Sequence, residues 1–267
     1  MSLHDEYART TPFEIAFPDE ARLKELVEAV MEESSSRSVD PELPGIFMTL
    51  GSVGDFVREL QTPNAPESAL HQYGALVFHA VHFARAGRPT YLLETPAARG
   101  LVNSAPAGDP RPHESAGYLQ LPQHLFWMDG SEGKAPESVD GLFWFVPKTD
   151  VIHVLPITGV LSDQPGFTAL ALPEAPLGDA RQWLDADMRG SEPDYSSSLP
   201  GHDLDQLYSV ESTGEVLKLL ARFFAYLEST PAAREDVAAG EGGGPTESRT
   251  KGPSPSALPY TRVHLLA

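Results

Sequence analysis

The sequence has 267 residues, of which 41% are hydrophobic, and it carries a formal net charge of −19. That length and hydrophobic content are typical of a folded globular protein. The charge disfavours binding to nucleic acid or anionic lipid, because both draw on clusters of Lys and Arg and the 19 basic residues are scattered along the chain. The lack of cysteine excludes disulfides, thiol nucleophiles and thiolate metal sites.

Residues 1–17 contain no basic segment followed by an apolar one, so we expect no signal peptide. The sequence also has no run of about 18 apolar residues, the length that a membrane-spanning helix needs. We therefore expect a cytoplasmic protein of bacterial type.

The first third of the sequence predicts helices. "PDEARLKELVEAVMEESSS" has apolar residues at helical spacing and acids in its first turn. "GSVGDFVREL" begins with Ser52 and Asp55 in capping-box spacing, and "NAPES" opens the next helix with Asn64 and Glu67. That last helix should be about 22 residues long and end before Gly87.

The last of these helices contains three histidines, His71, His79 and His82. At 100° per residue they fall on one narrow polar sector of an otherwise apolar helix. We interpret them as a stripe that faces solvent or a partner. The alternatives are a metal or acid–base site and buried, hydrogen-bonded histidines.

The metal alternative is limited by the rise of the helix. The first and last of the three histidines are about 16 Å apart along the axis, so only His79 and His82 could share one ion. Further ligands would come from the segment that follows, for example His113, Glu114 or His124. Such a site would suit a metal-assisted hydrolase, and the sequence predicts no cofactor other than this divalent metal.

From about residue 90, apolar runs bounded by turn residues predict strands. The runs "GLFWFVP" and "VIHVLPI" are separated by three residues and predict a hairpin, in which His153 shares a face with apolar neighbours and should lie in the core. Two later segments, "EAPLGDARQWLDADM" and "VLKLLARFFAYLE", predict helices. This order predicts an α+β fold: N-terminal helices, a central, mainly antiparallel sheet of about four to six strands, and flanking C-terminal helices.

The expected organisation is a single globular domain over residues 1–230. Its helical part covers 1–88 and its sheet-centred part 89–230. Residues 231–258 are of low complexity and predict a flexible linker. Residues 259–267 form an apolar tail rich in strand-forming residues.

The tail should dock either as an edge strand of its own fold or on another chain. We expect Tyr260, Val263 and Leu265 to make this contact. A tail on a long linker could also mediate self-association.

The sequence contains no phosphate-binding G-x-x-x-x-G-K-[ST], no H-E-x-x-H and no G-x-S-x-G motif. We therefore hypothesise an accessory protein that acts through protein–protein contact, by its acidic surface on a basic partner or by its tail. The alternative is the metal-assisted hydrolase that uses His79 and His82. A third hypothesis, an acidic mimic of nucleic acid, is weaker because the carboxylates are dispersed along the sequence.

Overall fold

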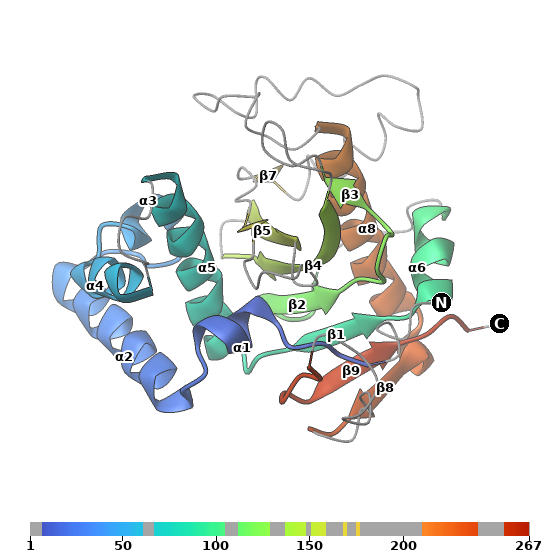
Figure 1. Ribbon diagram of the computed structural model, residues 1–267, viewed down its shortest axis with the longest axis horizontal. Helices are drawn as coiled ribbons and strands as arrows, with labels where there is room; N and C mark the ends of the chain where they lie inside the picture. Colours follow the sequence, from blue (N-terminus) through green and yellow to red (C-terminus); the bar gives the residue numbers. More distant parts are fainter. Residues whose placement is uncertain are drawn as a thin grey trace.

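The computed structural model describes residues 7–60, 67–104, 112–128, 137–147, 151–158, 168–169, 175–176, 210–239 and 254–266. These stretches form one sheet with helices packed on both of its faces (Figure 1). Among the helices so described, none combines the length and the apolar character that crossing a membrane requires.

The N-terminal helices form a layer on one face of the sheet (Figure 1). The side chain of Asp19 caps the second of them, since it accepts a hydrogen bond of 2.9 Å from the amide of Ala21. The fifth helix ends where Gly87 adopts a left-handed backbone with φ of 86°, as its position in the sequence predicts. The helices are α1 (Pro12–Ala16), α2 (Glu20–Arg37), α3 (Pro44–Phe47), α4 (Gly51–Leu60) and α5 (Glu67–Arg85).

The sheet is mixed, and its main path runs β6-β5-β4-β2-β1-β9-β8, with β3 beside β4 and β7 beside β5. β1 pairs in parallel with β2 and β9, and the other pairs are antiparallel. The predicted α+β class and the mainly antiparallel sheet are therefore confirmed. The strands are β1 (Thr90–Leu93), β2 (Ala116–Gln120), β3 (Trp127–Met128), β4 (Glu137–Phe145), β5 (Val151–Thr158), β6 (Thr168–Ala169), β7 (Ala175–Pro176), β8 (Arg234–Val237) and β9 (Tyr260–Val263).

Two helices, α6 (Thr95–Val102) and α8 (Val210–Ser229), cover the opposite face of the sheet. The last of these is one of the two predicted C-terminal helices. The other, in "EAPLGDARQWLDADM", lies outside the described residues except for Ala175–Pro176, which form β7.

The sheet separates two apolar cores. Successive strand residues point to opposite faces, so Phe143 packs against the N-terminal helices and Trp144 packs against α8. This is why the run "LFWF" is continuously apolar. A Cβ atom at Gly117, opposite Trp144, would come within 2.3 Å of the indole, so the absence of a side chain there lets the indole lie across β2.

The predicted hairpin is confirmed as β4 and β5, which pair antiparallel. The pairing runs from Val139 opposite Thr158 to Phe145 opposite His153, with a register shift between Val139 and Gly141. The C-terminal tail is also part of the sheet. β9 lies between β1 and β8 (Figure 1), so the tail docks within its own fold.

The predicted linker starts too early. A 3-10 turn, η4 (Pro231–Ala233), and the strand β8 occupy its first residues. β8 has the polar sequence "REDV", which carries no strand pattern, and it forms because β9 supplies a backbone to pair with. Residues 240–253 lie outside the described residues.

Candidate functional site

The two histidines predicted as a metal pair are buried in α5. Only 4% of His79 and 2% of His82 is exposed, and the imidazole of His82 stacks on Phe145 of β4 with 3.8 Å between ring centroids. The predicted stripe facing solvent or a partner is therefore wrong at both positions, because α5 lies between the sheet and the helices α2 and α4. The side chain of His71 is outside the described part of the structure.

A third histidine, His153 of β5, joins this pair and is buried, as its strand pattern predicts. The ring of Phe78 lies 5.4 Å from His79, 4.7 Å from His82 and 5.5 Å from His153, measured between centroids. Burial lowers the pKa of His79 well below its ordinary value, that of His82 to about 3 and that of His153 to about 4. All three imidazoles are thus neutral at pH 7.

The hydrogen bonding of these rings is sparse. Nε2 of His82 lies 3.3 Å from the carbonyl oxygen of Pro41. Nδ1 of His79 is buried and has no hydrogen-bond partner in the described stretches. A general base must come within hydrogen-bond distance of its substrate, and these rings are enclosed by phenylalanines. The histidines serve the packing of α5 on the sheet.

The proposed further metal ligands lie elsewhere. Glu114 lies near Tyr91, which belongs to the core on the α8 side of the sheet. Burial and the carboxylate of Glu114 raise the pKa of Tyr91. His113 is exposed, and His124 stacks on Trp127 of β3. In the described part of the chain, no group of three or more His, Asp or Glu side chains is arranged to hold a metal ion. The hydrolase hypothesis therefore has no ligand set there.

The predicted contact residues of the tail have different environments. Tyr260 and Val263 are 6% and 0% exposed, and Val263 belongs to the same core as α8. Leu265 is 49% exposed and lies beside α6, where a Cβ at Gly100 would come within 3.3 Å of it. Within this chain, only Leu265 of the three presents a large apolar surface to solvent.

A buried polar cluster has no signal in the sequence. Arg9 is 2% exposed, and its guanidinium donates hydrogen bonds to the carbonyl oxygens of Leu121 (2.8 Å) and Asp140 (3.2 Å). Its backbone amide donates to Oε1 of Gln120 at 2.6 Å. These bonds fix the N-terminal segment to the sheet, so we assign Arg9 to the fold.

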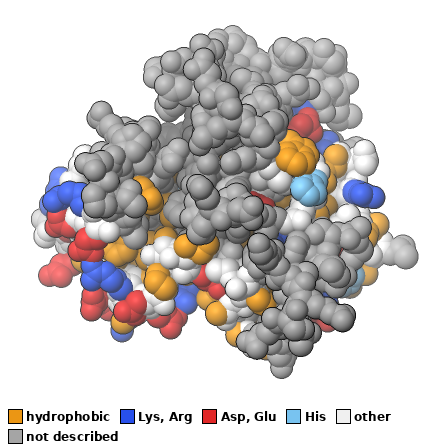
Figure 2. All heavy atoms as spheres, in the orientation of Figure 1, with side chains coloured by type: hydrophobic (Ala, Val, Ile, Leu, Met, Phe, Trp, Pro, Cys, Tyr) orange, Lys and Arg blue, Asp and Glu red, His pale blue; other side chains and the backbone are white. Residues whose placement is uncertain are grey.

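The surface of α2 carries a row of carboxylates. Glu25, Glu28 and Glu32 are exposed, and at 100° per residue they lie within a sector of about 60°, on the side away from the buried residues of α2. We call these three residues the acidic row. Figure 2 shows acidic and basic side chains gathered over the part of the surface formed by α2 and α4.

The basic residues of the same helices are already paired with acids. Residues 19–60 contain ten acidic and four basic side chains, and each of the four bases forms an ion pair within this layer. The pairs are Arg22–Glu59, Lys24–Glu28, Arg37–Glu33 and Arg58–Asp55. Glu25 and Glu32 form no ion pair among the described residues, so the acidic row keeps a negative charge.

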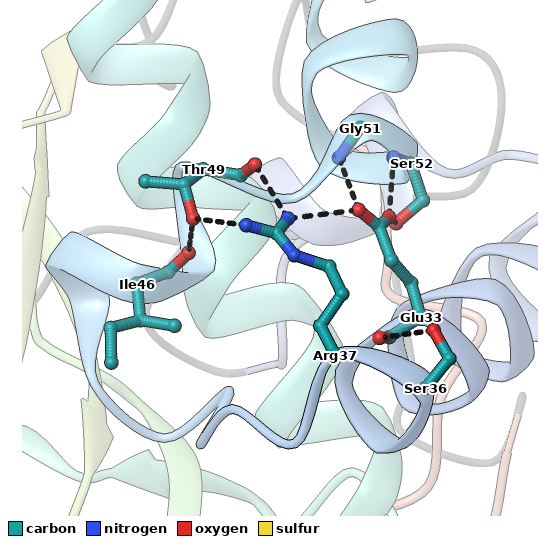
Figure 3. A network of polar contacts seen from close by, with 7 residues as sticks. All are labelled: Glu33, Ser36, Arg37, Ile46, Thr49, Gly51 and Ser52. Carbon is teal, nitrogen blue, oxygen red and sulfur yellow. Dashed lines mark hydrogen bonds and ion pairs between the residues drawn. The ribbon is translucent and has the colours of Figure 1, made fainter.

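A network of polar contacts fixes α2 against α4 (Figure 3). The carboxylate of Glu33 accepts hydrogen bonds from the backbone amides of Gly51 (2.8 Å) and Ser52 (3.0 Å) and from the hydroxyl of Ser52 (2.9 Å). Arg37 donates to Glu33 at 3.1 Å and to the carbonyl oxygen of Thr49 at 3.0 Å. The backbone bonds lower the pKa of Glu33 to about 2.

Glu33 therefore caps α4, a role that the sequence assigns to Ser52. The first amides of a helix lack partners within it and attract an anion, and here the anion comes from a neighbouring helix. Capping by a residue 18 positions away cannot be read from local sequence spacing.

Comparison of the chain with models of protein families, with curated proteins and with solved structures finds no significant match. The functional argument therefore rests on the residues and geometry above.

Proposed function

We propose that the protein is an accessory protein that binds a protein partner with a basic surface, and that the acidic row on α2 makes the contact. In this proposal the chain binds and does not catalyse. The single observation that carries it is the row itself: three exposed carboxylates on one side of a helix whose other side is buried.

The position of the row supports a binding role. α2 is held to α4 by the Glu33 and Arg37 bonds and by the ion pair between Arg22 and Glu59. The backbone that carries the row is thus fixed before a partner arrives, which lowers the entropic cost of binding. The one ion pair in the row, Lys24–Glu28, has a separation of 3.8 Å and both side chains are largely exposed, so it competes weakly with a partner.

The chemistry of the partner follows from the charge. A net charge of −19 attracts basic proteins over distances comparable to the Debye length, about 10 Å at 0.1 M salt, and raises their association rate. We expect Lys and Arg side chains of the partner opposite Glu25, Glu28 and Glu32. The tail is less suited to the contact, because Tyr260 and Val263 are taken up by the chain's own cores.

The test is a charge-neutralising triple variant, Glu25→Gln with Glu28→Gln and Glu32→Gln. Partners are first captured by cross-linking in the producing cells, identified by mass spectrometry and purified. We expect the captured protein to be basic and the triple variant to bind it roughly tenfold more weakly, since exposed ion pairs contribute about 0.5 kcal/mol each. Affinity should fall as salt rises.

The matched control removes the same charge away from α2 and α4, by Glu228→Gln with Glu235→Gln and Asp236→Asn, all at exposed positions. It should keep the wild-type affinity to within about twofold. Equal weakening by both triples would mean that overall charge alone attracts the partner, and unchanged binding by the acidic-row variant would contradict the proposal.

A further inference from the structure

A cavity lies between the first half of α2 and the end of α5, which are packed side by side (Figure 1). Its volume is about 380 Å³, near the lower end of the range for small-molecule sites. Its apolar lining includes Val27 and Ala84, which are partly exposed, and its described cationic lining consists of Lys24, Arg85 and Arg88. Three cationic side chains around one cavity make the local charge positive, although the chain as a whole is strongly negative.

The charge balance of the cavity favours an anion. Among the described residues that line it, Glu20 is the only acidic one, and it is already paired with Arg88 at 2.6 Å. Lys24 has a distant partner, Glu28, at 3.8 Å. The side chain of Arg85 is exposed and forms no ion pair or hydrogen bond with any residue that the structure describes. Its guanidinium, with five N–H donors, is therefore available to a ligand.

Arg88 is held in place on three sides. Its φ of 63° lies in the left-handed region, which costs a residue with a side chain about 1 kcal/mol. The hydrogen bond from its amide to the carbonyl oxygen of Phe83 (2.9 Å) maintains this conformation. Its guanidinium lies against Glu20 and 5.8 Å from the ring centre of Phe13. This cation is thus positioned before any ligand binds, as an anion site requires.

The cavity adjoins the acidic row, since Lys24 of its lining pairs with Glu28 of the row at 3.8 Å. On a helix with 100° per residue, Lys24 and Val27 lie about 40° to 160° away from Glu25, Glu28 and Glu32 around α2. An anion in the cavity would therefore compete with Glu28 for Lys24, while Val27 lies on the side of α2 away from the row.

We propose that this cavity binds a small oxyanion, a carboxylate or a phosphate monoester, that carries a short apolar chain. Arg85 and Lys24 hold the oxyanion by charge-assisted hydrogen bonds, and the apolar chain lies against Val27 and Ala84, which are partly exposed. We take the ligand to be a free small molecule, whose oxyanion and short apolar chain fit a volume of about 380 Å³.

The experiment is a titration of the ¹⁵N-labelled full chain with hexanoate and with hexyl phosphate, followed by amide chemical shifts. We expect saturable shifts at the start of α2 and the end of α5 with at least one of the two. Arg85→Gln should weaken that binding about tenfold, the usual cost of a lost charge-assisted hydrogen bond, and Lys24→Gln should weaken it in the same direction. Both side chains are exposed, so the variants should fold, as wild-type-like spectra would verify.

The matched control is Arg58→Gln, which removes an exposed arginine of α4 outside the cavity, and it should leave the affinity unchanged. Hexylammonium should not bind, and inorganic phosphate should bind more weakly than hexyl phosphate. The proposal is overturned if neither anion gives saturable shifts at α2 and α5, if Arg85→Gln binds as wild type, or if hexylammonium binds equally well.

Discussion

His79, His82 and His153 stay neutral in the folded protein because burial lowers their pKa values, whereas in the unfolded chain they take up protons near pH 6.5. The unfolded state therefore binds more protons in acid. Their contribution to stability is fully present above about pH 6.5 and decreases as the pH falls towards 4 and 3.

We predict that the free energy of unfolding falls by about 2 kcal/mol per buried histidine between pH 7 and pH 5. His82→Phe, which keeps a ring against Phe145, should reduce this pH dependence by roughly one third. Urea unfolding at several pH values measures it. The control is His113→Gln at an exposed position, which should leave the slope unchanged, and a wild-type slope in His82→Phe would contradict the assignment.

Glu33 also stabilises the protein less as the pH falls, but in a lower pH range, because its pKa is lowered from about 4.5 to about 2 when the protein folds. The stability that its carboxylate contributes is fully present above about pH 4.5 and is lost as the pH falls towards 2. We predict that Glu33→Gln destabilises the protein by about 1 kcal/mol at pH 7, the usual effect of losing a helix cap, and by less at pH 4.

The matched control for this prediction is Glu32→Gln, the preceding residue, which is exposed and caps no helix. Urea unfolding at pH 7 and at pH 4 gives both differences. A difference between wild type and Glu33→Gln that does not shrink at pH 4 would show that the charge of Glu33 is not what stabilises α4.

At the scale of elements, β9 connects β8 to the rest of the sheet, so the stability of both strands depends on residues 260–263. We predict that Val263→Ala, at a position with 0% exposure, costs about 1–3 kcal/mol. Leu265→Ala, at a half-exposed position, should cost less than about 1 kcal/mol. Thermal unfolding of both variants measures these losses in stability. Repeating it at several protein concentrations tests whether β9 packs within its own chain.

Because β9 pairs within its own chain, the midpoint of unfolding should not depend on protein concentration. A midpoint that rises with concentration would indicate that the tail is exchanged between chains.

Elements with a strong local pattern could be predicted from the sequence. α2, the β4–β5 hairpin, α8 and the strand at 260–263 each have an apolar spacing that matches their structure. β8 could not be predicted, because its four residues gain their strand conformation from pairing with β9 and not from their own side chains.

The environment of the histidines could not be predicted for a related reason. A helical projection shows that His79 and His82 share a side of α5, but it does not show which neighbour covers that side. Phe145 of β4, more than 60 residues later, covers it. Likewise the cavity at Arg85 requires α2 and α5 to be adjacent, and the sequence carries no sign of that pairing.

For the whole molecule, charge and packing are arranged on different parts. The two apolar cores lie on the two faces of the sheet. The charged layer lies outside them, and residues 19–60 alone contain ten acidic and four basic residues. The proposed anion cavity lies at the boundary between these regions, where α2 meets α5. A partner on the acidic row and a ligand in the cavity would thus contact adjoining parts of α2, which meet at the Lys24–Glu28 pair.

The placement of β9 also has a consequence for synthesis of the chain. The central strand β1 has β9 as one of its two neighbours, and Glu14 bonds to Ser256, 242 residues away in sequence. On a ribosome that adds about 5–20 residues per second, the N-terminal helices and β1 must wait at least about ten seconds for that neighbour. During this interval one edge of β1 is open to wrong partners, so we expect the nascent chain to need protection that the finished protein does not.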